Sequence, residues 1–140
     1  MDYNHLRILQ VRLQLIEFYL RIMLNKLKQD PEDTSFLLYS FKNDMDQETK
    51  IKMIKHINHV LGDIDKLKEK FELESEERSF VHSIMMDMVE ISAILSDTKP
   101  ERFVDDYGDI PISEEKLLRH HVLTMIHKMN DMYKELGYKI

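Results

Sequence analysis

The sequence contains no cysteine among its 140 residues, and only three glycines and three prolines. The absence of cysteine excludes disulfides, a thiol nucleophile and thiolate metal ligands. It also fits a reducing compartment. Because the sequence shows neither a secretory signal nor a membrane span, we expect a cytoplasmic protein by default. The scarcity of glycine and proline disfavours turn-dense β folds, because such folds need these residues at their many tight turns.

Long hydrophobic runs are also missing. No window approaches the roughly 20 apolar residues that a membrane-spanning helix requires. Arg12, Glu17 and Arg21 interrupt the apolar residues near the N-terminus, so we expect no secretory signal. The net charge of −6 disfavours nucleic-acid binding, because neutralising phosphates requires a basic patch. We therefore expect neither a membrane nor a nucleic acid as a partner.

Hydrophobic residues make up 43% of the chain, which is enough for a core. They recur about every 3.5 positions through most of the sequence, which indicates helices. We predict an all-α protein with one helical-bundle domain over residues 1–140. Its architecture would be an antiparallel up-down bundle of four long helices, with one short helix after the first. The predicted ranges are 2–29 for the first helix, 31–43 for the short helix, then 46–71, 76–97 and 114–136, with an irregular segment over 98–112.

Short polar residues precede most of these helices and predict their N-caps. The predicted caps are Asp30, Asp44 or Asp46, Ser75 and Ser113. Gly137 is the predicted terminator of the last helix. Gly62 lies inside a predicted helix, where glycine costs about 1 kcal/mol relative to alanine. We attribute Gly62 to close packing against a neighbour, or else to a local bend.

The first predicted helix carries two apolar stripes. The first stripe comprises Leu6, Leu9, Leu13, Ile16, Leu20, Met23 and Leu27. The second stripe comprises Ile8, Val11, Leu15, Phe18 and Ile22. The second is displaced from the first by two residues, or about 200° around the helix axis, so the two stripes face nearly opposite directions. The polar residues of this helix fall on the borders between them.

A helix on the outside of a bundle needs only one apolar stripe. Burying the five side chains of the second stripe is worth about 8–15 kcal/mol gross, so we expect something to cover it. Segment 31–43 could fold back over it, segment 98–112 could cross it, or a second copy or another protein could dock there. The short segments do not easily cover five positions that span about 21 Å of helix. We therefore favour a homodimer built on the second stripe.

Ten methionines are many for this length, and they concentrate on the last two helices. Either they form an adaptable groove for a partner helix, or they belong to a loosely specified core. On the last helix the heptad stripe is Leu118, Val122, Met125, Met129, Met132 and Leu136. On the helix before it, Met86 with Val89 and Ala93 forms a partial second stripe. That partial stripe could form the edge of the same interface.

Seven histidines raise the possibility of a metal site. Helical metal sites typically use Glu-x-x-His pairs, and none is present at the candidate histidines. We expect His56 and His121 to be partly buried, because they flank apolar stripes. We predict no catalytic, cofactor-binding or metal-binding residue.

The sequence thus favours a small helical protein that acts through protein–protein contacts, of a regulatory, adaptor or immunity type. The alternative is a helical-bundle metal-binding protein or enzyme that uses bundle histidines and carboxylates. Its candidate residues are His56, His59, His82 and His121, together with an acid.

Overall fold

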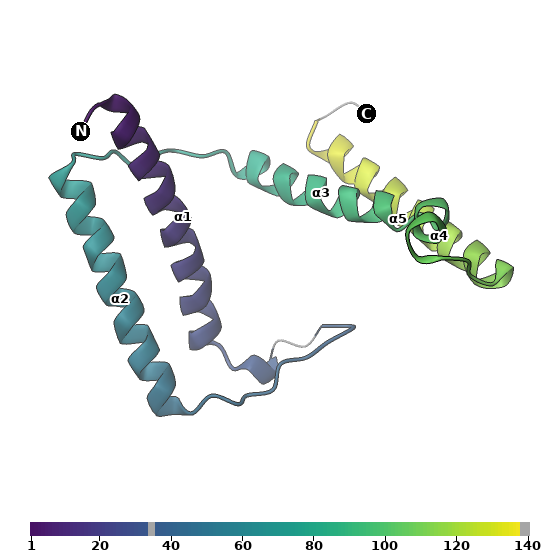
Figure 1. The fold of residues 1–140 in the computed structure, drawn as a ribbon, viewed down its shortest axis with the longest axis horizontal. Coiled ribbons are helices and arrows are strands. Elements are labelled where there is room, and N and C mark those ends of the chain that lie inside the picture. The colour runs from purple at the N-terminus through teal and green to yellow at the C-terminus, as the bar shows by residue number, and fades with distance from the viewer. Residues whose placement is uncertain (34–35, 138–140) are drawn as a thin grey trace. The chain divides into compact units, whose positions relative to one another are not determined.

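The computed structural model describes residues 1–33 and 36–137. The described residues form five α-helices and one short 3₁₀ turn, and no strand occurs among them. Figure 1 shows how the chain runs through the helices. The elements are α1 (Tyr3–Lys28), η1 (Pro31–Asp33), α2 (Gln47–Lys70), α3 (Phe80–Asp97), α4 (Pro100–Tyr107) and α5 (Ile112–Glu135). The prediction of an all-α protein is confirmed.

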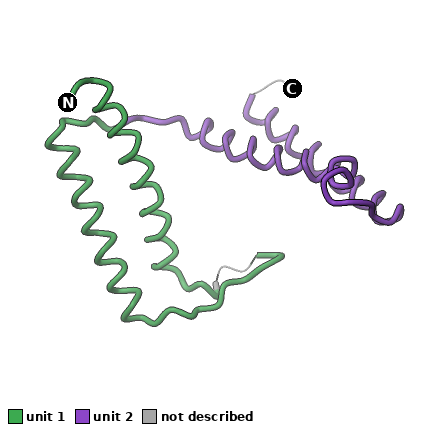
Figure 2. The backbone as a smooth tube through the Cα atoms, viewed as in Figure 1, with its two compact units in different colours: residues 1–75 green, residues 76–140 purple. Residues whose placement is uncertain are grey.

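The helices group into two compact units, residues 1–75 and residues 76–140 (Figure 2). In the first unit α1 and α2 pack against each other as an antiparallel hairpin. In the second unit α3 packs against α5, and the short helix α4 contacts both. The up-down arrangement of four helices within one domain stays a prediction.

In the unit of residues 1–75, the helices meet along one face of α1. The buried side chains are Leu13 and Leu24 on α1 and Ile57 on α2. Ile16 and Met23 of the first stripe are exposed instead, at 45% and 39%. A straight helix has 3.6 residues per turn, so its buried face drifts by about 20° per heptad from a strict 3.5-residue stripe. Leu24 therefore occupies the buried position that the heptad spacing gave to Met23.

The core of the unit of residues 76–140 is built on methionine and leucine. Met88, Leu95 and Met129 form a buried cluster, and Ile84, Ile126, Tyr133 and Leu136 pack against it. Val122 is also buried. Met125 and Met132 are exposed, although the heptad stripe included them. Ile126 and Tyr133 point inward in their place and keep the seven-residue spacing, so the buried face of α5 is rotated about the helix axis relative to the predicted stripe.

Two of the helix starts differ from the prediction. α3 begins at Phe80, where the Ser79 hydroxyl accepts a hydrogen bond from the His82 backbone N–H at 3.1 Å, so Ser75 is not its cap. Ser79 stands directly before the apolar repeat, where its hydroxyl satisfies a free N–H group of the first turn. α5 begins at Ile112 after Pro111, which places Ser113 inside the first turn.

The predicted cap at Asp46 is confirmed. Its carboxylate accepts a hydrogen bond from the Thr49 backbone N–H at 2.7 Å, and this bond lowers the pKa of the Asp46 carboxyl. Near the C-terminus of the chain, Gly137 adopts a φ of +85° directly after the C-cap of α5. Glycine reaches this left-handed conformation without strain, as expected for a helix terminator.

The predicted helix over 31–43 does not form in the described residues. Asp30 caps only η1, and residues 36–46 form an irregular connection. The rings of Phe36, Tyr39 and Phe41 contact one another, with centroid distances of 4.5–6.3 Å. The three aromatic side chains therefore pack around a turn and do not lie along one face of a helix. The Leu37 and Leu38 side chains at that turn are fully exposed.

The predicted irregular segment 98–112 contains the helix α4. Pro100 is buried at its first turn, where proline is favoured because its fixed φ suits a helix start. Phe103 and Val104 are half-buried, whereas Tyr107 is exposed. The prediction of a wholly irregular segment is wrong because the eight residues Pro100–Tyr107 suffice for two helical turns.

Close packing does not explain Gly62, because a Cβ built there meets no atom within 4 Å. We expect Gly62→Ala to raise the free energy of unfolding by about 1 kcal/mol, since alanine loses less backbone entropy in a helix. Thermal unfolding followed by circular dichroism would measure this. The control is Gly108→Ala, which should destabilise the protein because Gly108 has a φ of +99°. A Gly62→Ala variant that unfolds at a lower temperature would contradict the prediction.

Candidate interaction face

The second stripe lies on the side of α1 that points away from α2. Ile8, Val11, Leu15 and Phe18 are 52–59% exposed, and Ile22 is half-buried. Leu13 and Leu24, on the opposite side of the same helix, are buried. The predicted division of α1 into two apolar faces is therefore present, and α2 covers one of them.

The described part of segment 31–43 leaves the second stripe exposed. The aromatic rings of residues 36–41 contact one another, and Leu37 and Leu38 are fully exposed. In Figure 1 the connection leaves the C-terminal end of α1 and does not run back along the helix. Folding of this segment over the stripe, one of the covers considered from the sequence, is thus not observed in the described residues.

The borders of the second stripe are basic. Helix α1 contains five basic residues and one acidic residue, Glu17, in a chain whose net charge is −6. The basic residues are Arg7, Arg12, Arg21, Lys26 and Lys28. The single acid is bonded within the helix, since the Arg21 guanidinium donates to the Glu17 carboxylate at 3.2 Å. The exposed apolar face of α1 therefore has a positively charged surround.

Helix α3 has the opposite charge. It contains three acidic residues, Asp87, Glu90 and Asp97, and neither lysine nor arginine. Its partial second stripe is exposed, with Met86 at 52% and Val89 at 48%. This side points away from the buried Met88 and Leu95, because residues two apart on a helix lie about 200° apart. α3 thus also presents apolar side chains to the surface, among acids.

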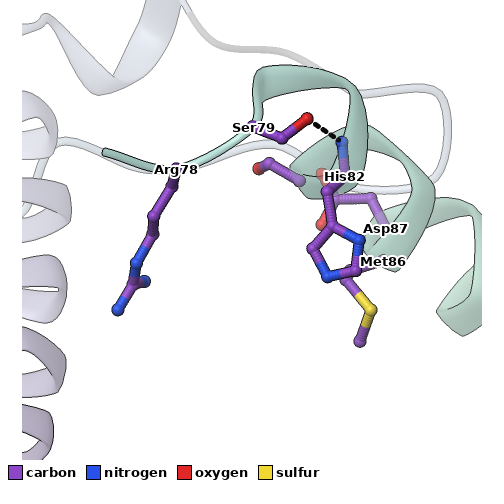
Figure 3. A pocket seen from close by; sticks show the side chains of 6 residues that line it. Arg78, Ser79, His82, Met86 and Asp87 are labelled. Atoms are coloured by element: carbon purple, nitrogen blue, oxygen red, sulfur yellow. Dashed lines mark hydrogen bonds between the residues drawn. The ribbon is translucent and has the colours of Figure 1, made fainter. Parts of the chain in front are cut away.

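A hollow of about 560 Å³ lies at the start of α3 (Figure 3). Its lining consists of Arg78, Ser79, His82, Ser83, Met86 and Asp87, all from one stretch of chain. Ligand sites in enzymes usually enclose a substrate between several elements, with convergent polar groups. A hollow along one helix does not enclose a ligand in this way, and the Ser79 hydroxyl already serves as the cap of α3.

The histidines named as candidate ligands lie at exposed positions on three helices. His56 and His59 are on α2, His82 is on α3 and His121 is on α5, and all four side chains are exposed. The expectation that His56 and His121 are partly buried is wrong, because each precedes the inward-pointing residue by one position. Across residues 1–33 and 36–137, no three histidine or carboxylate side chains gather into a set that could hold a metal ion.

Arg119 of α5 forms ion pairs with one carboxylate of α4 and one of its own helix. The Arg119 guanidinium donates to the Glu115 carboxylate at 2.7 Å and also to the Glu101 carboxylate. The bond to Glu115, and then the bond to Glu101, raises the pKa of Arg119. The pKa of Glu101 is lowered by a hydrogen bond from its own backbone and further by Arg119. Both pKa values move away from neutrality, so these groups suit a tether better than acid–base catalysis.

Comparison with known proteins adds no functional information. No protein-family model matches the sequence, and neither the curated proteins nor the solved structures give a match. None of the helices within the described ranges is long and apolar enough to cross a membrane. The exposed second stripe and the basic residues on its borders are therefore the features of the chain that bear on its function.

Proposed function

We propose that the protein is a small helical interaction protein of a regulatory, adaptor or immunity type, which forms a homodimer through the second stripe. The observation that carries this proposal is the exposure of Ile8, Val11, Leu15 and Phe18 on one face of α1. A continuous apolar face of this kind is a common property of protein–protein contact surfaces. Burying these side chains against a partner would recover free energy comparable to the net stability of a small domain.

The small cores of the two units support the proposal. Apart from Pro100, only seven apolar side chains are buried in the described residues. They are divided between the two units. Units of about 70 residues bury a small fraction of their surface and are marginally stable unless further contacts are made. A helical hairpin that exposes one apolar face is also half of a four-helix bundle. We propose that assembly of such halves gives the antiparallel four-helix arrangement.

Changing Leu15 and Phe18 together to glutamate tests this function. Two carboxylates buried without partners would cost several kcal/mol, so we expect the dimer to weaken at least about a hundredfold. Light scattering at micromolar concentration should show a dimer for the natural sequence and a monomer for the variant. Circular dichroism should show that the variant retains its helices, because both side chains already lie at the surface of the unit.

The matched control is Leu37→Glu with Leu38→Glu, which places the same charges on fully exposed side chains outside the stripe. This control should remain a dimer. A natural protein that stays monomeric at every concentration would contradict the proposal. An unfolded Leu15→Glu, Phe18→Glu variant would also contradict it, because the stripe would then belong to the core.

A further inference from the structure

The dimer proposed above leaves open which surface of the second copy covers the second stripe. The symmetric possibility is that α1 of one copy packs on α1 of the other. The borders of the stripe oppose this arrangement, because α1 has five basic residues and one acid. If the two helices run antiparallel, Arg7 of one copy lies near Arg21 of the other; if they run parallel, Arg7 lies near Arg12. Like charges across a helix interface are unfavourable in either direction.

The acidic helix of the chain offers a better match. α3 carries Asp87, Glu90 and Asp97 without any lysine or arginine, and it exposes Met86 and Val89. Its 18 residues extend over about 27 Å, whereas the second stripe spans about 21 Å. α3 is therefore long enough to cover the whole stripe. Glu90 lies four residues from Met86, and Asp97 lies four residues from Ala93, so these two carboxylates border the exposed apolar side of α3 and can face the arginines on the stripe's borders. Complementary charges of this kind select one partner surface over another.

We propose that the second stripe of α1 binds the acidic outer side of α3 from a second copy of the chain. Each copy supplies one α1 and one α3, so a two-fold dimer contains this contact twice. The inference rests on the proposed dimer and adds the identity of the covering surface. Apolar contact between the stripe and residues such as Met86 provides the affinity, and the opposite charges determine which helices meet.

Charge reversal on each helix tests the contact. One variant carries Arg7→Glu and Arg12→Glu, and the other carries Glu90→Lys and Asp97→Lys. We expect each to raise the dimer dissociation constant by about tenfold to a hundredfold, because each brings like charges together twice in the dimer. All four side chains are exposed, so circular dichroism should show unchanged helices. Sedimentation equilibrium would measure the dissociation constants.

The decisive variant combines all four substitutions in one chain. Its α1 is acidic at the border and its α3 is basic, so the proposed contact is complementary again and dimerisation should recover to within about fivefold of the natural protein. Pairing of α1 with α1 makes a different prediction: Glu90→Lys with Asp97→Lys would leave the dimer unchanged, and the combined variant would have the same dissociation constant as Arg7→Glu with Arg12→Glu alone. Either result would overturn the inference.

The outcomes separate this inference from the proposed function. If Leu15→Glu with Phe18→Glu abolishes the dimer while the α3 reversal leaves it intact, the second stripe is the interface but α3 is not its partner. If the natural protein is monomeric throughout, both proposals fail. If the dimer survives Leu15→Glu with Phe18→Glu, the proposed function fails whatever the charge variants show.

Discussion

Replacing Met88 by alanine is expected to lower the free energy of unfolding of residues 76–140 by about 2–5 kcal/mol. Met88 is 2% exposed and lies in the cluster with Leu95 and Met129. Truncation removes the transfer free energy of the side chain and leaves a cavity that its neighbours fill only in part. Urea unfolding, followed by amide hydrogen exchange across α3 and α5, would measure the loss in this unit.

Met125→Ala is the matched control, because it removes the same atoms from a side chain that is 46% exposed. We expect it to cost less than about 1 kcal/mol. Equal losses for the two variants would show that α5 presents its heptad stripe to α3, which would contradict the packing described above.

Replacing Leu24 by alanine is expected to have an effect of similar size, about 2–5 kcal/mol, in residues 1–75. Leu24 is 5% exposed and packs toward α2, close to the C-terminal end of α1. Few other side chains of this unit are buried, so the remaining contacts cannot compensate for the cavity. Amide hydrogen exchange should show faster exchange along α1 and α2, while α3 and α5 keep their protection.

The neighbouring substitution Met23→Ala is the control for register. Met23 is 39% exposed, and its truncation should cost less than about 1 kcal/mol. A larger loss at Met23 than at Leu24 would mean that α1 and α2 wind around each other with a 3.5-residue repeat. The pair therefore distinguishes a straight hairpin from a coiled coil.

Much of the helical framework could be predicted from the sequence. The first helix was placed within one residue at each end, and Asp46 was among the predicted caps. The identity of the inward-pointing residues was less predictable, because apolar side chains at both Met23 and Leu24 satisfy a helical repeat. Only the rotation of α1 against α2 decides between them, and that rotation depends on a neighbour distant in sequence.

The connections were predicted poorly for a different reason. Phe36 and Tyr39, three residues apart, fit one apolar helix face when counted along the chain, but their rings pack with that of Phe41 around a turn. α4 was missed because Pro100 and Gly108 indicate irregular structure when they are considered alone. In the structure they mark the beginning and end of a short helix. The second stripe was located from the sequence because its five residues follow a repeat longer than any local turn.

The exposed turn at Leu37 and Leu38 is a position where the chain can accept an insertion or new termini. Its side chains contribute little to the hairpin core, and the backbone there belongs to neither α1 nor α2. Exposed loop tips of this kind are where chains best tolerate insertions and new termini. A fluorophore or affinity tag introduced at this turn would leave both the second stripe and α3 unmodified, so the assembly could be observed without altering the surfaces proposed to form it.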